Sequence, residues 1–105
     1  MKIIKRSGEE VEFEKEKISI AISKANLEVS EDDKLNEDQM EYIVNIIEKK
    51  VKKSRHIMNI EDVQNMVEEE IVSFGKYKLA KRYIIYRYEH EQLRKKNTTD
   101  AAILS

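Results

Sequence analysis

The stretch that decides the fold is KIIKRSGEEVEF, residues 2–13. Within it, residues 2–6 and 10–13 are short segments in which apolar and polar side chains alternate, and Gly8, preceded by a serine, lies between them. Alternation is typical of a half-buried strand, and a Ser-Gly pair between two such segments indicates a tight turn. The sequence therefore predicts an N-terminal β-hairpin. Residues 56–59 are a candidate for a third short strand beside it.

Four segments after the hairpin repeat apolar residues at intervals of three and four, as an amphipathic helix does. The first begins near Lys15, and the second follows Asn36, whose side chain can cap a helix while Gln39 reaches back to it. The third follows Asn59, and the fourth begins near Lys76, directly after a glycine. The predicted apolar faces, helix by helix, are Ile18, Ala21, Ile22 and Ala25; Met40, Ile43, Val44, Ile47 and Val51; Val63, Met66, Val67, Ile71 and Phe74; and Tyr77, Ala80, Ile84 and Tyr88. The expected fold is mainly α with a small β element, in which the hairpin caps a four-helix bundle.

The composition limits the classes of protein that this chain can belong to. A length of 105 residues suits one domain, which we expect to span residues 1–95, with residues 96–105 as a linker or the start of a following domain. The 20 basic and 21 acidic residues nearly cancel, which disfavours nonspecific nucleic-acid binding. The absence of cysteine excludes a disulfide framework and favours a cytoplasmic protein. No apolar run approaches the roughly 20 residues that a membrane-spanning helix needs.

Two motifs at opposite ends of the helical pattern carry a family resemblance. The first is Lys-Arg at residues 5–6 and then Gly8, with Lys-Ile at residues 17–18 opening the first helix. The second is YIIYR, residues 83–87. In this order the motifs resemble the ATP-cone, a small nucleotide-binding regulatory domain. With the continuation over residues 91–100, the chain is similar to the N-terminal regulatory domain of anaerobic (class III) ribonucleoside-triphosphate reductases.

The resemblance implies a site for ATP or dATP formed by the hairpin, the start of the first helix and the fourth helix. A triphosphate carries roughly four negative charges at neutral pH and needs cations that converge from separate elements. The residues implied to contact phosphate are Lys5, Arg6, Lys17, Arg87 and His90. The residues implied to hold the adenine are Val11, Glu12, Phe13 and Glu14. Glu14 stands where the family more commonly has Asn or Asp, and His90 where relatives often have a basic residue. Lys5 and Arg6, as neighbours on one strand, are expected to point to opposite faces.

Several of these residues have an ordinary structural interpretation as well. Phe13 suits core packing, which we favour over a role as a platform for the base. For the tyrosines Tyr77, Tyr83, Tyr86 and Tyr88, we likewise favour interface and core positions over contact with the nucleotide. The lysine-rich run at residues 49–53 is interpreted as a solvated helix end. His56 and His90 lack the spacing of zinc ligands, so we expect no protein-bound metal.

The resemblance implies regulation and no chemistry in this chain. Binding of ATP or dATP, accompanied by Mg²⁺, would control the activity or oligomerisation of an attached anaerobic ribonucleotide reductase. The partners implied are the nucleotide, the rest of the reductase chain and further copies of the cone, with no membrane and no nucleic acid. Two alternatives stay open. One is the ATP-cone of a repressor of reductase genes, which in that family follows a four-cysteine zinc ribbon that is absent here. The other is a helical protein-interaction module without a ligand.

Overall fold

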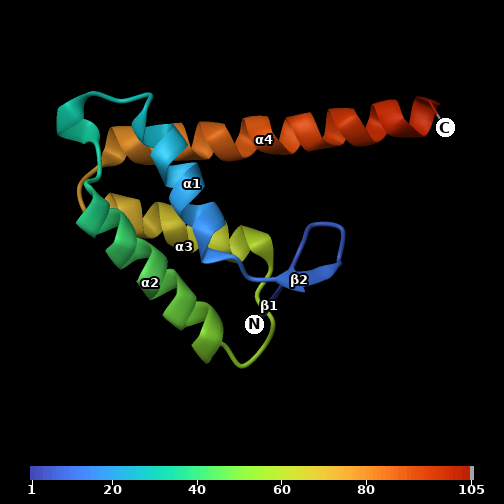
Figure 1. Cartoon of the computed structure of the whole chain (residues 1–105), viewed down its shortest axis with the longest axis horizontal. Helices are drawn as coiled ribbons and strands as arrows, with labels where there is room; N and C mark the ends of the chain where they lie inside the picture. Colours follow the sequence, from blue (N-terminus) through green and yellow to red (C-terminus); the bar gives the residue numbers. More distant parts are fainter. Residues whose placement is uncertain (105) are drawn as a thin grey trace.

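The computed structural model (Figure 1) describes the backbone of residues 1–104 and the side chains of residues 1–93. A two-stranded hairpin precedes a series of α-helices, and in Figure 1 it lies beside the starts of α1 and α3. The elements in chain order are β1 (Lys2–Ile4), β2 (Glu10–Glu12), α1 (Lys15–Asn26), the short 3₁₀ turn η1 (Glu31–Asp33), α2 (Glu37–Lys53), α3 (Ile60–Ser73) and α4 (Tyr77–Leu104). The expected mainly helical fold with a small β element is confirmed.

The hairpin is antiparallel and turns one face to the helices. Ile3 pairs with Val11 across the two strands, and both side chains pack in or against the core. The connecting loop is closed by the Lys5 N–H, which donates to the Glu9 carbonyl at 2.8 Å. Gly8 lies in this loop with φ of 90°, a left-handed conformation that glycine adopts without strain. The Ser-Gly signal therefore located the turn correctly.

The loop begins earlier than the alternating pattern predicts. Lys5 and Arg6 follow β1 instead of belonging to it, because the hydrogen bond between Lys5 and Glu9 closes the loop there. Phe13 likewise follows β2. The predicted strand ends were wrong, and so was the expectation that Lys5 and Arg6 point to opposite faces of a strand. Side chains in the loop therefore need not alternate between two faces, as they would on a strand.

The third strand expected near residues 56–59 is reduced to one point of contact. The Ile4 N–H donates to the Met58 carbonyl at 2.9 Å, and Ile4 and Asn59 form an isolated parallel bridge. This bridge ties the outer edge of β1 to the segment that leads into α3. The hairpin is thereby held beside the start of α3.

The predicted helix ends are confirmed by their caps. Asn36 and Gln39 form a reciprocal capping box at the start of α2, with hydrogen bonds of 2.8 and 2.9 Å. The Asn59 side chain accepts a 2.8 Å hydrogen bond from the Asp62 N–H at the start of α3. Such caps satisfy backbone donors that a helix leaves unpaired. Gly75, at φ of 75°, separates α3 from α4.

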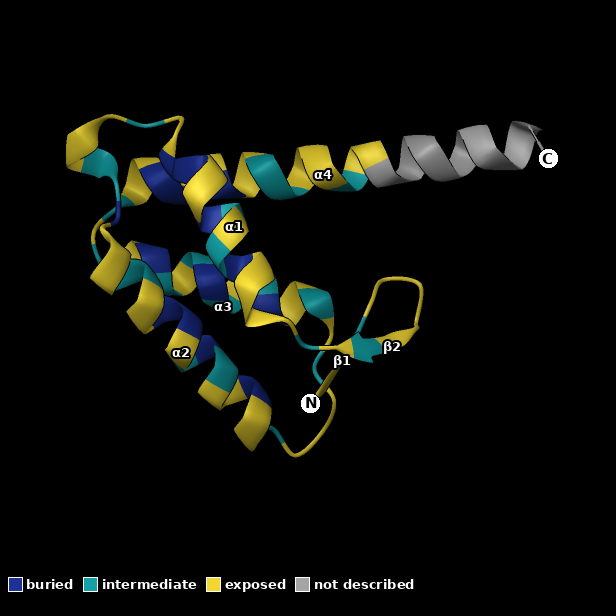
Figure 2. Ribbon diagram, in the orientation of Figure 1, coloured by how far each residue is buried: buried dark blue, intermediate teal, exposed yellow. Residues whose placement is uncertain are grey.

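The core lies between the helices and is closed at one end by the inner face of the hairpin (Figure 2). The buried apolar residues are Ile3, Ile18, Ile22, Ala25, Leu35, Ile43, Val44, Ile47, Val51, Val63, Val67, Ile71, Leu79, Ala80 and Tyr83. Full burial of one large apolar side chain contributes about 1.5–3 kcal/mol. The predicted faces of α1, α2 and α3 are confirmed, with Ala21, Met40, Met66 and Phe74 partly buried at their edges.

The apolar face of α4 differs from the prediction. Of the predicted face only Ala80 is buried, and the exposed members are Tyr77 (65%), Ile84 (48%) and Tyr88 (63%). Leu79 and Tyr83 meet the core instead, and burial raises the pKa of the Tyr83 phenol. The helix carries two apolar stripes, and periodicity alone does not say which one faces the core. We call the exposed residues Tyr77, Ile84 and Tyr88 the α4 stripe.

Candidate functional site

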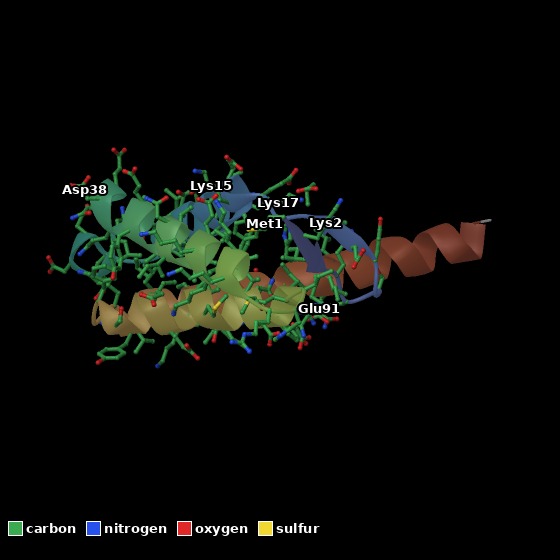
Figure 3. The ribbon with its side chains drawn as sticks, turned by 90° about the horizontal axis from the view of Figure 1, so that it is seen from below. Met1, Lys2, Lys15, Lys17, Asp38 and Glu91 are labelled. Carbon is green, nitrogen blue, oxygen red and sulfur yellow. The ribbon has the colours of Figure 1, made fainter. Side chains whose placement is uncertain are left out.

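Arg6 reaches from the hairpin loop to two helices. Its Nη1 atom lies 3.0 Å from Oε1 of Glu61 on α3 and 2.7 Å from Oε1 of Glu91 on α4. Its Nη2 atom donates a 3.4 Å hydrogen bond to Oε1 of Gln64. Figure 3 shows Glu91 on α4, below the hairpin in that view. We call the contact of Glu61, Arg6 and Glu91 the carboxylate bridge, because it ties the loop to α3 and α4 together.

Arg87 lies on α4, one helical turn before the α4 carboxylate of that bridge. Its Nη1 atom forms an ion pair with Glu68 and a 3.4 Å hydrogen bond to Oδ1 of Asn65, both on α3. The Arg87 side chain is only 16% exposed, and its Nε atom is buried without a hydrogen-bond partner among the described residues. Burial lowers the pKa of the Arg87 guanidinium, the positive charge of Arg6 lowers it further, and two nearby carboxylates oppose the shift. The charge of Arg6 therefore acts on Arg87.

The partners of both arginines were missed in the sequence. We call the whole group the arginine cluster, and its members are Arg6, Glu61, Gln64, Asn65, Glu68, Arg87 and Glu91. The four members on α3 recur at intervals of three and four, so they share one face of that helix. That spacing is a polar stripe that could have been noticed in the sequence. What it contacts becomes visible only in the fold.

The start of α1 holds a second group of predicted residues. The Lys17 Nζ atom lies 3.1 Å from Oε2 of Glu14, one turn apart, and the two side chains are 76% and 53% exposed. Glu14 is the N-cap residue of α1, and its side chain makes no capping hydrogen bond. Figure 3 shows Lys17 above the hairpin, whereas Glu91 lies below it in the same view. We call Glu14 and Lys17 the α1 pair.

The predicted base-holding stretch of β2 divides between the two faces of the hairpin. On the outer face, Glu12 contacts the N-terminal amine of Met1 at 3.2 Å and the Nζ atom of Lys2 at 3.1 Å. Hydrogen bonds from Lys2 and from the N-terminus lower the pKa of the Glu12 carboxyl. On the inner face, Val11 and Phe13 pack against the core, as favoured for Phe13.

The two remaining predicted residues lie apart from these groups. The His90 ring stacks on Tyr86, with centroids 5.0 Å apart and an angle of 22° between the rings. Lys24 on α1 lies over the same tyrosine, with its Nζ atom 5.9 Å from the ring centroid. Lys5 is exposed in the hairpin loop. His90 therefore contacts its own helix, and its neighbour Tyr86 makes the contact with α1.

Of the nine predicted residues, Arg6 and Arg87 meet on the same face of α3 from opposite ends of the chain, and Glu14 contacts Lys17 one turn away. None of the nine lines the groove of about 340 Å³ between α1 and α2, whose lining includes Lys15, Ser23 and Met40. In the part of the chain that the structure describes, no three His, Cys, Asp or Glu side chains are grouped to hold a metal ion. No helix in that part is long and apolar enough to cross a membrane.

The chain is thus a hairpin on a small helical core, with Arg6 of the glycine loop and Arg87 of α4 on the same face of α3. Residues 1–92 match the family of the ATP cone domain, and the chain belongs to this family. It is an allosteric nucleotide-binding domain related to the regulation of ribonucleotide reductases.

One relative is the ribonucleoside-diphosphate reductase subunit alpha of Chlamydia muridarum (strain MoPn / Nigg). It is 30% identical over 111 residues, which cover 98% of this chain and 11% of the relative. The chain thus spans about a tenth of the length of this relative. The family expected from the two sequence motifs is confirmed. The relative is a diphosphate reductase, however, and not the anaerobic triphosphate reductase expected from the continuation over residues 91–100.

Proposed function

We propose that this domain binds ATP and dATP and uses the bound nucleotide to control the activity or oligomerisation of an attached ribonucleotide reductase. Membership of the ATP-cone family and the relationship to a reductase subunit support this proposal. The observation that carries it is the position of Arg6 and Arg87. One comes from the hairpin loop and the other from α4, and both contact the same face of α3. Cations from separate elements are what a triphosphate requires.

In this proposal, the phosphates contact the arginines together with Lys5 and Lys17. The buried Nε–H of Arg87 is a donor that no described residue uses, and a phosphate oxygen could accept from it only after the Arg87 side chain moves. Lys17 adds its charge in the first turn of α1, where the helix dipole also favours an anion. Mg²⁺ would accompany the nucleotide as an ion bound by the phosphates. His90 would add positive charge only when protonated.

The base would lie along residues 11–14. Adenine presents an amino group, and the carboxylate of Glu12 or Glu14 can accept a hydrogen bond from it. Guanine presents a carbonyl oxygen at the same position, which a carboxylate repels. This difference favours ATP and dATP over GTP. Val11 and Phe13 would support the stretch from the core side.

On the resemblance carried by residues 91–100, the attached protein would be an anaerobic ribonucleoside-triphosphate reductase in the cytoplasm. Residues 1–95 would form the regulatory domain, and residues 96–105 would lead into the next part of that chain. The α4 stripe offers an apolar surface for contacts with the reductase or with another copy of the cone. The cysteines and the substrate site of the reaction would belong to the rest of the reductase.

Calorimetry with the magnesium complexes of ATP, dATP and GTP tests the proposal. We expect ATP and dATP to bind with micromolar dissociation constants, about −8 kcal/mol, and GTP to bind at least about tenfold more weakly. A ligand at 100 times its dissociation constant should add about 2.7 kcal/mol to the free energy of unfolding. If no nucleotide gives a heat of binding or a thermal shift, the result would favour the ligand-free interaction module. Equal affinity for GTP would mean that the base is not recognised.

A further inference from the structure

The arginines of the proposed site already hold carboxylates. Arg6 contacts Glu61 at 3.0 Å and Glu91 at 2.7 Å, and Arg87 is paired with Glu68. These contacts use the Nη1 atom of both arginines, and bidentate recognition of phosphate needs two guanidinium N–H groups at once. A carboxylate and a phosphate oxygen compete for the same N–H groups. A nucleotide that binds here must therefore compete with carboxylates that are already paired with the arginines.

The charges of the arginine cluster strengthen this competition. Two guanidiniums face three carboxylates, so the seven side chains together carry one negative charge at neutral pH. A triphosphate brings roughly four more negative charges. Like charges within a few ångströms repel, and they do so more strongly in a partly buried setting than in water. The same two arginines cannot pair fully with the glutamates and with the nucleotide phosphates at the same time.

The two arginines are not equally available for exchange. The Arg6 side chain is 37% exposed and belongs to a loop, and its bridge partners Glu61 and Glu91 are 56% and 23% exposed. Arg87 is 16% exposed and fixed on a helix, with Glu68 at 23%. Exposed ion pairs are weak, about 0–1 kcal/mol, so the contact of Arg6 with Glu61 can open at little cost. Arg6 is therefore the residue that changes partners.

We propose that Glu61 and Glu91 set the nucleotide affinity of this domain by competing with the phosphates for Arg6. Nucleotide binding would exchange the carboxylate bridge for contacts between Arg6 and phosphate, and this inference rests on the proposed nucleotide function. Because the bridge joins the hairpin loop to α3 and α4, the exchange also releases the loop from both helices. The ligand thus changes how the hairpin is attached as well as filling a site.

The alternative role for the same glutamates is to position Arg6 for the nucleotide. The two roles predict opposite results for Glu91→Gln, which keeps the shape of the side chain and removes its charge. Competition predicts that ATP binds about fivefold more tightly to the variant, the equivalent of one weak ion pair. Positioning predicts weaker binding. Glu89→Gln is the matched control, because it removes the same charge from an exposed position on the same helix.

The experiment is calorimetry of MgATP with the parent chain, Glu91→Gln and Glu89→Gln, together with melting temperatures with and without ATP. Competition predicts that Glu91→Gln melts slightly lower alone and gains a larger shift with ATP, while Glu89→Gln matches the parent. Equal or weaker ATP binding by Glu91→Gln would overturn the inference and leave the nucleotide function intact. Equal strengthening in both variants would also overturn it, since only general charge would matter. If neither the parent nor Glu91→Gln binds ATP, the proposed function itself fails.

Discussion

Two regions supply the cations of the proposed nucleotide site, and they are built differently. In the arginine cluster, Arg87 is 16% exposed and contacts α3 from α4, and Arg6 bridges both helices. In the α1 pair, Lys17 is 76% exposed and its contact is with Glu14, one turn away. Loss of one member of a buried pair leaves an uncompensated charge, whereas an exposed pair contributes little. Substitutions in the arginine cluster should therefore change both nucleotide affinity and stability. Substitutions in the α1 pair should change nucleotide affinity alone.

The largest effect is expected where the cluster is most buried. Arg87→Ala should lower the free energy of unfolding by about 3 kcal/mol, because Glu68 loses its partner and the guanidinium loses its packing. Urea unfolding of the variant and the parent measures this difference. Arg82→Ala is the control, since Arg82 is exposed on the same helix and should stay within about 0.5 kcal/mol. A loss as small as that of the control would remove the distinction between the two regions.

A smaller effect is expected at Phe13, which belongs to neither region and packs against the core. Phe13→Ala should destabilise the domain by about 2 kcal/mol, less than the roughly 3–5 kcal/mol of a fully buried ring, because the side chain is only partly buried. ATP affinity, measured well below the melting temperature, should stay near that of the parent. A tenfold loss of affinity in a folded variant would instead make this ring a platform for the base.

The smallest effect on stability is expected in the α1 pair. Lys17→Glu should change the free energy of unfolding by less than about 0.5 kcal/mol, because the side chain is exposed. ATP affinity should fall at least about tenfold, or 1.4 kcal/mol, through repulsion between the new carboxylate and phosphate. Lys15→Glu makes the same charge change in the same turn and should affect binding less. Parent-like ATP binding by Lys17→Glu would show that the start of α1 does not contact phosphate.

The sequence predicted those features that depend on local chemistry. The caps at Asn36 and Asn59 and the turn at Gly8 follow from the side chain or backbone of one residue, and all three were correct. The core face of α4 was not, because two apolar stripes compete and only packing against α1 and α3 decides between them. Periodicity cannot distinguish Leu79 from Tyr77 in such a helix.

The candidate site was predictable only in part, for the same reason. The two sequence motifs include Arg6 and Arg87, but the carboxylate partners of these arginines come from elements that are distant in the sequence. No local sequence pattern near Arg6 indicates that Glu91 is its partner. The phosphate and base contacts assigned to the nine residues stay predictions, which the variants above can test.

The carboxylate bridge also bears on the order in which the chain folds. Contacts between neighbours in sequence form early, and closing a long loop has an entropic cost that delays contacts between distant segments. Arg6 and Glu91 are separated by nearly all of the described side chains, and the cluster needs α3 in place between them. A growing polypeptide would therefore have every helix except the last before it has a nucleotide site. Nucleotide binding, on this view, reports that the domain has finished folding.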